Sequence, residues 1–168
     1  MANTSNSQIP SNCLEAYVLC SDRSAEVVAA FLNVIAPKRK SVHLDFPFPQ
    51  FSDAPTRVFE GAEPLIVHLL EQADYEYSIY WDCFDNVLCG QVMLFFTADG
   101  GLIAGIANFS ISPTDALSTV MQVARGEFGY VTCDSPPPES REEFIEVSRR
   151  AEGARIIDGR IECGHEAL

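Results

Sequence analysis

Apolar residues recur along this chain at one of two spacings, either every second residue or every third to fourth residue. The first spacing is typical of a β-strand with one buried face, and the second of an amphipathic helix. Strands are predicted at 15–20, 41–46, 57–60, 77–82, 91–97, in the segment after Gly101, and at 130–133. Helices are predicted at 22–36, 63–73, 113–125 and 141–151.

Capping residues mark the ends of several predicted helices. Ser21 or Asp22 is suited to cap the first helix, Ser112 the third and Ser140 the fourth, because their side chains can accept from the free N–H groups of a first turn. Gly126 is expected to end the third helix. In the predicted order, several strands follow one another between helices, which differs from the regular alternation of repeated βαβ units.

The longest apolar strands lie in the middle of the chain, between residues 75 and 108. Alternation along 77–82 predicts an inner face of Tyr77, Ile79 and Trp81 and an outer, wetter face of Ser78, Tyr80 and Asp82. Segment 91–97 is apolar on both faces, which is typical of a strand covered on both sides.

A tight turn is predicted at Asp99-Gly100, between the last two strands of this stretch. If the loop has two residues, Phe96 pairs with Ile103, and Gly105 lies opposite Leu94, where it leaves room for a closely packed helix. Three adjacent antiparallel strands result. The predicted fold class is α+β: a mainly antiparallel sheet with a central three-strand meander and helices packed on it.

The expected domain organisation is simple. Residues 1–13 form a polar lead-in, residues 14–152 a single α+β domain, and residues 153–168 a polar C-terminal tail. Residues 1–12 lack the basic and apolar regions of a secretory signal, so a cytoplasmic protein with reduced thiols is expected.

Several residues between 38 and 68 admit more than one interpretation. The basic run 38–40 is expected to complement the C-terminal end of the first helix rather than to bind phosphate. His43 and His68 are both expected to face solvent. Phe48 and Phe51, in a Pro-rich loop, are either interaction anchors or a lid on the core.

Charge narrows the possible partners. The chain carries 11 Lys and Arg against 24 Asp and Glu, a net charge of -13. This charge repels nucleic acid and anionic lipid and attracts a basic partner, so neither nucleic acid nor membrane binding is expected. Most of the excess lies between residues 41 and 122, where Arg57 is the only cation.

No motif for catalysis, metal or cofactor binding is visible. The six cysteines lack the spacing of a zinc site, and Cys83 and Cys89 have no histidine nearby in sequence. The three histidines occur in no catalytic context, and the glycines at 100–105 are not followed by the Lys-Ser/Thr of a phosphate loop. We therefore predict a protein that is not an enzyme and has neither cofactor nor metal.

Acidic residues crowd around the aromatic residues of the central stretch. Such a surface either serves solubility or forms an interface for a basic protein, in which charges surround aromatic anchors. The candidate partner-binding residues are Asp74, Glu76, Tyr80, Asp82, Asp85 and Asp99.

The sequence YSIYWD at 77–82, followed after a short insert by VMLFFTADGGLIAGI at 92–106, resembles the core of immunity proteins from bacterial polymorphic-toxin and contact-dependent inhibition systems. In that family a YW strand precedes a hairpin of the pattern FFTxDGGLIxG. The resemblance implies a small cytoplasmic protein that binds a cognate toxin domain stoichiometrically and blocks it. The net charge indicates that this toxin is basic.

Two other functions stay open at this point. An acidic secretion chaperone or adaptor would be an obligate dimer that binds an unfolded segment. A small hydrolase would use one of the cysteines or histidines. The sequence leaves the oligomeric state and the identity of the toxin open.

Overall fold

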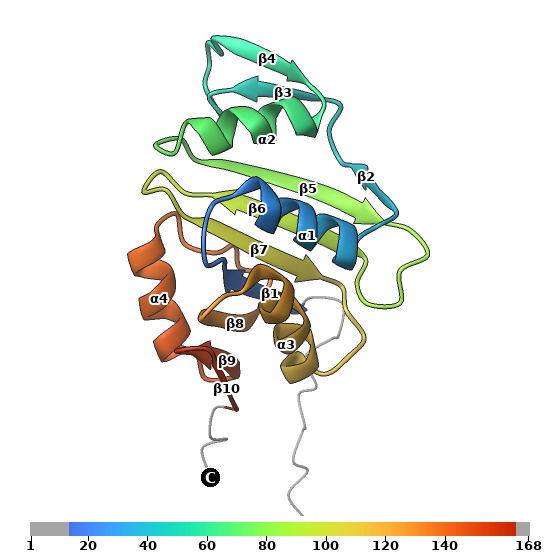
Figure 1. Cartoon of the computed structure of the whole chain (residues 1–168), viewed down its shortest axis with the longest axis vertical. Coiled ribbons are helices and arrows are strands. Elements are labelled where there is room, and N and C mark those ends of the chain that lie inside the picture. The colour runs from blue at the N-terminus through green and yellow to red at the C-terminus, as the bar shows by residue number, and fades with distance from the viewer. Residues whose placement is uncertain (1–13, 164–168) are drawn as a thin grey trace, which may run out of the picture.

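Within residues 14–163, which the computed structural model describes, the strands form an eight-stranded sheet and a separate hairpin (Figure 1). The sheet order is β10-β9-β8-β1-β7-β6-β5-β2. Its strands are β1 (Leu14–Leu19), β2 (Arg39–Ser41), β5 (Tyr77–Cys83), β6 (Gln91–Phe96), β7 (Leu102–Ala107), β8 (Phe128–Cys133), β9 (Ala154–Ile157) and β10 (Arg160–Cys163). The separate hairpin joins β3 (Asp45–Phe48) to β4 (Arg57–Glu60). All these pairings are antiparallel, so the predicted α+β class is confirmed.

The β5–β6–β7 meander is confirmed, but the predicted register of its second turn is wrong by one residue. Phe96 pairs with Leu102 rather than Ile103, and Gly105 lies opposite Met93 rather than Leu94. The reason lies in Thr97, whose N–H donates to the Gly101 carbonyl at 3.1 Å and whose Oγ1 accepts from the Gly101 N–H at 2.8 Å. The loop therefore has three residues, with Gly100 at φ 83°.

Four helices occur among the described residues: α1 (Ala25–Ile35), α2 (Ala62–Glu71), α3 (Pro113–Ala124) and α4 (Arg141–Arg150). Ser112 and Ser140 cap α3 and α4 as predicted. The cap of α1 is Ser24, which accepts from the Val27 N–H, and not Ser21 or Asp22. Arg39 donates to the Leu32 and Ala36 carbonyls, which confirms that a residue of the basic run complements the end of α1.

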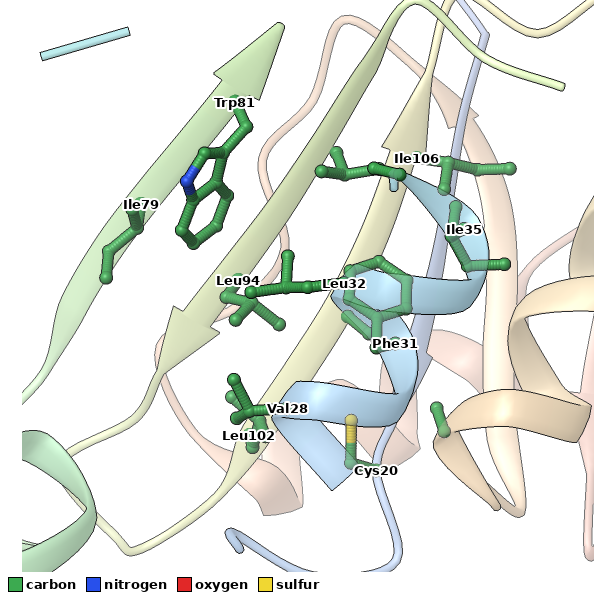
Figure 2. Packing of buried hydrophobic residues seen from close by; sticks show 14 of the residues in the cluster. Cys20, Val28, Phe31, Leu32, Ile35, Ile79, Trp81, Leu94, Leu102 and Ile106 are labelled. Carbon is green, nitrogen blue, oxygen red and sulfur yellow. The ribbon is translucent and has the colours of Figure 1, made fainter. Parts of the chain in front are cut away.

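One face of the sheet packs against α1 and α3, and the larger core lies there. Figure 2 shows Trp81 and Ile79 of β5 near Leu94 of β6, and Phe31 and Leu32 of α1 on the helix that covers this part of the sheet. Phe31 is fully buried, and burial of a side chain of this size contributes about 2–3 kcal/mol. Helix α2 and the β3–β4 hairpin extend this core past β5 (Figure 1).

The strand predicted at 41–46 is split in two. Ser41 ends β2, which pairs with β5, and the chain then leaves the sheet so that Val42 and Leu44 are exposed. Phe46 restarts as part of β3 and is buried against Tyr77. The alternation in 41–46 therefore does not mark one strand, because Val42 and Leu44 lie in the connection between β2 and β3.

His68 is half-buried, contrary to the prediction that it faces solvent. Its ring lies 4.7 Å from that of Phe48 and 5.2 Å from that of Phe59. The β3–β4 hairpin folds over the side of α2 that was expected to be open. Phe48 is thereby part of the core, whereas Phe51 is 92% exposed.

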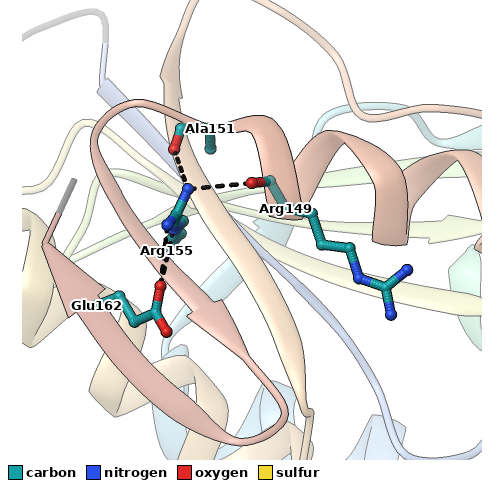
Figure 3. A network of polar contacts seen from close by, with 4 residues as sticks. All are labelled: Arg149, Ala151, Arg155 and Glu162. Atoms are coloured by element: carbon teal, nitrogen blue, oxygen red, sulfur yellow. Dashed lines mark hydrogen bonds and ion pairs between the residues drawn. The ribbon is translucent and has the colours of Figure 1, made fainter. Parts of the chain in front are cut away.

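The segment after residue 153 was expected to be a polar tail, but residues 154–163 form the β9–β10 hairpin, which extends the sheet beside β8. Arg155 fixes this hairpin to the end of α4 (Figure 3). Its guanidinium donates to the Arg149 and Ala151 carbonyls at 3.0 Å each and to the Glu162 carboxylate at 3.0 and 3.1 Å. Residues 1–13 and the end of the predicted tail lie outside the described residues.

The expectation of reduced thiols does not hold throughout, because Cys133 is disulfide-bonded. Cys20, Cys83, Cys89 and Cys163 are free.

Candidate functional site

The second face of the sheet carries a continuous row of aromatic rings. Tyr80 of β5 meets Phe95 of β6 edge to face, with ring centroids 5.7 Å apart, and Phe95 meets Tyr17 of β1 in the same way at 5.7 Å. Tyr17 then contacts Tyr130 of β8 at 6.0 Å, and Tyr130 contacts Phe144 of α4 at 5.2 Å. The row crosses the sheet from the edge near β2 to α4.

Gly105 makes this row possible. It pairs directly with Tyr17 in the β1–β7 ladder, and a Cβ atom at position 105 would lie 2.7 Å from Tyr17 Cδ1. The Tyr17 ring thus lies across the glycine. The predicted role of Gly105 in admitting a helix is wrong, because a ring from the adjacent strand occupies that space.

Helix α4 covers one end of this face only. It packs on β1, β8 and β9, whereas β5 lies at the other end of the strand order. Over β5 and β6 the cover comes from residues 136–138, the Pro-rich segment before α4, which leaves a pocket of about 290 Å³. We call this the β5 pocket. Its lining residues are Gln50, Phe51, Glu76, Tyr77, Ser78, Tyr80, Phe95, Phe96, Thr97, Pro136, Pro137, Pro138 and Glu139.

Gln50 forms one wall of the β5 pocket and pairs with the backbone of Ser78. Its Nε2 donates to the Ser78 carbonyl at 3.1 Å, and its Oε1 accepts from the Ser78 N–H at 2.7 Å. The side-chain amide thus takes the place of a neighbouring strand at this point, because β2 pairs only with residues 81–83 of β5. Phe51, next to Gln50, presents its exposed ring at the pocket mouth.

The β5 pocket is negatively charged. Glu76 and Glu139 are both exposed, and within residues 14–163 neither forms an ion pair. No Lys or Arg occurs among the described lining residues. Two free carboxylates beside aromatic rings favour a cationic side chain, which can pair with the carboxylates and lie over a ring.

The phenol groups along the row stay protonated at neutral pH. Burial raises the pKa of Tyr80, and burial together with the neighbouring Glu15 carboxylate raises that of Tyr17. The Tyr17 hydroxyl donates to Glu15 at 2.9 Å. These groups act as neutral donors and ring surfaces rather than as bases.

The structure brings together two of the six predicted site residues. Glu76 and Tyr80 line the β5 pocket, and Asp82 follows Tyr80 on the same face, where it accepts from Gln91 at 3.3 Å. Asp74 lies in the loop between α2 and β5, and Asp85 in the loop between β5 and β6.

Asp85 and Asp99 have structural partners. Asp85 forms an exposed ion pair with Lys38 at 3.1 Å. Asp99 accepts from the Thr97 hydroxyl and from the Arg141 N–H at 2.8 Å, so it fixes the start of α4. Burial alone would raise the pKa of the Asp99 carboxyl, but these two hydrogen bonds hold it below its usual range.

Sequence reasoning missed most of the other lining residues. Phe95 was expected in a strand covered on both sides, and nothing was predicted for Glu139. Exposed Phe51 was the one available signal, since it was considered as an interaction anchor.

Among residues 14–163, no group of three or more His, Cys, Asp or Glu is placed to hold a metal ion. No helix in that range has both the length and the apolar character needed to cross a membrane.

Comparison with protein-family models, with characterised protein sequences and with solved structures finds no match to this chain.

Proposed function

We propose that this chain is an immunity-type binding protein that neutralises a cognate toxin domain by binding it through the β5 pocket and the adjoining face of β5. The observation that carries the proposal is that two free carboxylates, Glu76 and Glu139, line the same pocket as the rings of Tyr80 and Phe51. The net charge of the protein, -13, favours the same kind of partner. The sequence resemblance at 77–106 supports the same function, and it implies that the interaction takes place in the cytoplasm.

In this proposal a lysine or arginine of the toxin enters the β5 pocket. The carboxylates at its mouth pair with the cation, and the rings contact its aliphatic stem. Asp82, on the same face, adds to the acidic rim. Interfaces of this kind combine a few aromatic anchors, which carry most of the binding free energy, with charges that accelerate encounter.

The test is co-expression of this chain with the toxin encoded beside its gene, followed by binding measurements on the purified pair. We expect the chain to rescue growth and to form a one-to-one complex. Tyr80→Ala is expected to weaken binding by about 30-fold or more, as for an interface hot spot.

The charge contribution needs a matched control. Glu76→Gln with Glu139→Gln removes two negative charges at the pocket, and Glu71→Gln with Glu152→Gln removes two exposed charges elsewhere. The first pair is expected to slow association several-fold more than the second. Equal effects, or growth arrest that is unchanged by the chain, would refute the proposal.

A further inference from the structure

The loop at 84–90 joins β5 to β6 (Figure 1), and hydrogen bonds hold it to the end of α1 and to the base of the hairpin. Asn86 Nδ2 donates to the Ile35 carbonyl at 2.7 Å, and the Phe84 N–H donates to the Lys38 carbonyl at 3.0 Å. At its base the Cys83 N–H donates to the Gly90 carbonyl at 2.9 Å. The loop thus holds the cysteines at its two ends, Cys83 and Cys89, in fixed positions.

The two cysteines are neighbours at the base of the loop. Cys83 and Cys89 are both free, residue 83 lies opposite residue 90, and the Cys83 side chain packs against the core cluster that contains Cys89. Cys83 is half-buried and open to reagents, whereas Cys89 is only 3% exposed. A disulfide brings the two sulfurs to about 2.05 Å, and it suits residues that lie close together at the base of a hairpin loop, as these two do.

The surroundings shift the pKa values of the two thiols in opposite directions. The hydrogen bond from Cys89 lowers the pKa of Cys83, with further contributions from Asn86 and Arg39, although partial burial opposes them. Donation of that same bond and burial raise the pKa of Cys89. Cys83 is therefore the group that becomes a thiolate first, and Cys89 is the thiol that can resolve an adduct on it.

We propose that Cys83 and Cys89 are a redox-active dithiol that low-molecular-weight disulfides, with oxidised glutathione as the test case, convert into an intramolecular disulfide.

The reaction has two balanced exchange steps. The Cys83 thiolate attacks one sulfur of oxidised glutathione, which forms a mixed disulfide and expels one glutathione thiolate with the electron pair of the broken S–S bond. Cys89 then gives its proton to solvent and attacks the Cys83 sulfur, which expels the second glutathione. The protein loses two hydrogen atoms, and one oxidised glutathione becomes two reduced molecules.

The experiment exposes the full chain to oxidised glutathione and follows the peptides that contain each cysteine by mass spectrometry. In the wild-type protein we expect a Cys83–Cys89 disulfide with little glutathione retained at either residue, reversed by reduced glutathione. The Cys89→Ala variant should instead keep a stable glutathione adduct at Cys83. The Cys83→Ser variant should leave Cys89 unmodified because it is buried.

Cys163→Ser is the matched control, since Cys163 is free and exposed but lies in β10, away from the pair. It should form the Cys83–Cys89 disulfide as the wild type does. The inference is overturned if the wild-type protein retains the adduct at Cys83, if Cys83 stays unmodified while Cys163 reacts, or if Cys89→Ala behaves as the wild type. Folding of each variant is checked through the fluorescence of Trp81, which is buried beside β6.

Discussion

Arg23 makes more hydrogen bonds than any other described side chain. Its guanidinium forms seven contacts with six backbone carbonyls, of Leu69, Gln72, Ala73, Tyr75, Thr97 and Gly101. It also lies 4.9 Å from the ring centre of Phe96. One side chain thus joins the end of α2 to the β6–β7 turn.

Replacement of Arg23 is expected to be costly because several carbonyls lose their donor at once. Arg23→Ala should lower the free energy of unfolding by about 3 kcal/mol. Arg23→Lys should recover only a minor part, since an ammonium cannot span the same set of acceptors. Urea unfolding followed by Trp81 fluorescence measures the difference. Arg150→Ala, which removes an exposed i,i+4 ion pair, is the control and should cost less than about 0.5 kcal/mol.

Asp99 gives a pH-dependent contribution to stability. Because its folded-state pKa lies below the unfolded value of about 3.9, the contribution is complete above that value and is lost as the pH falls through the folded pKa. Asp99→Asn is expected to cost about 0.5–1 kcal/mol at pH 7, the range of a helix-start contact, and almost nothing at a pH below the folded-state pKa. Urea unfolding at both pH values, with exposed Asp53→Asn as the comparison, tests this. A cost independent of pH would show that the carboxylate charge is not the cause.

At the scale of elements, the β9–β10 hairpin depends on α4 through Arg155. Arg155→Ala should increase amide hydrogen exchange in β9 and β10 while β1, β6 and β7 keep their protection, because the lost bonds join the hairpin only to its own Glu162 and to the end of α4. Arg160→Ala, which removes an exposed arginine of the same hairpin, should leave exchange nearly unchanged. Uniform loss of protection across the sheet would mean that the hairpin is part of the global unfolding unit.

The sequence pattern predicted the long elements well and the short ones poorly. The meander, α3 and α4 follow from strong periodicity and from caps such as Ser112 and Ser140. The 41–46 segment misled because Val42 and Leu44, which give it an alternating pattern, are exposed residues of the connection between β2 and β3. The β9–β10 hairpin was missed because each strand has only four residues, too few for a clear alternation, although Ile156 is buried in the core and Ile161 packs against it.

At the scale of the whole molecule, the net charge predicts fast association that depends on salt. If the proposed basic partner is correct, raising the NaCl concentration from about 50 mM to 500 mM should slow association by about tenfold or more, since exposed charges are screened within a few ångströms at the higher concentration. Dissociation should change much less. Stopped-flow mixing of the two proteins measures both rates, and an association rate independent of salt would leave the charge as a solubility feature.

The proposed site was only half visible in the sequence. Alternation along β5 places Tyr80 on the wet face, and the crowding of acids indicated Glu76. The rest of the β5 pocket comes from Gln50 and Phe51 on one side and residues 136–138 on the other, which tertiary packing alone brings to β5. The local sequence pattern does not predict which loops pack over a given strand.

The pairing of Gln50 with Ser78 also affects whether the protein self-associates at high concentration. The Tyr80 carbonyl accepts from the Val42 N–H, but residues 77–79 of β5 would otherwise present an unpaired strand edge, which is a template for another copy of the chain. One side-chain amide occupies the donor and the acceptor at its centre. We expect Gln50→Ala to assemble into larger species on concentration, visible by light scattering, whereas the exposed Gln122→Ala should not. Gln50, a single residue in a Pro-rich loop, thus blocks this edge of β5 from pairing with a second copy of the chain.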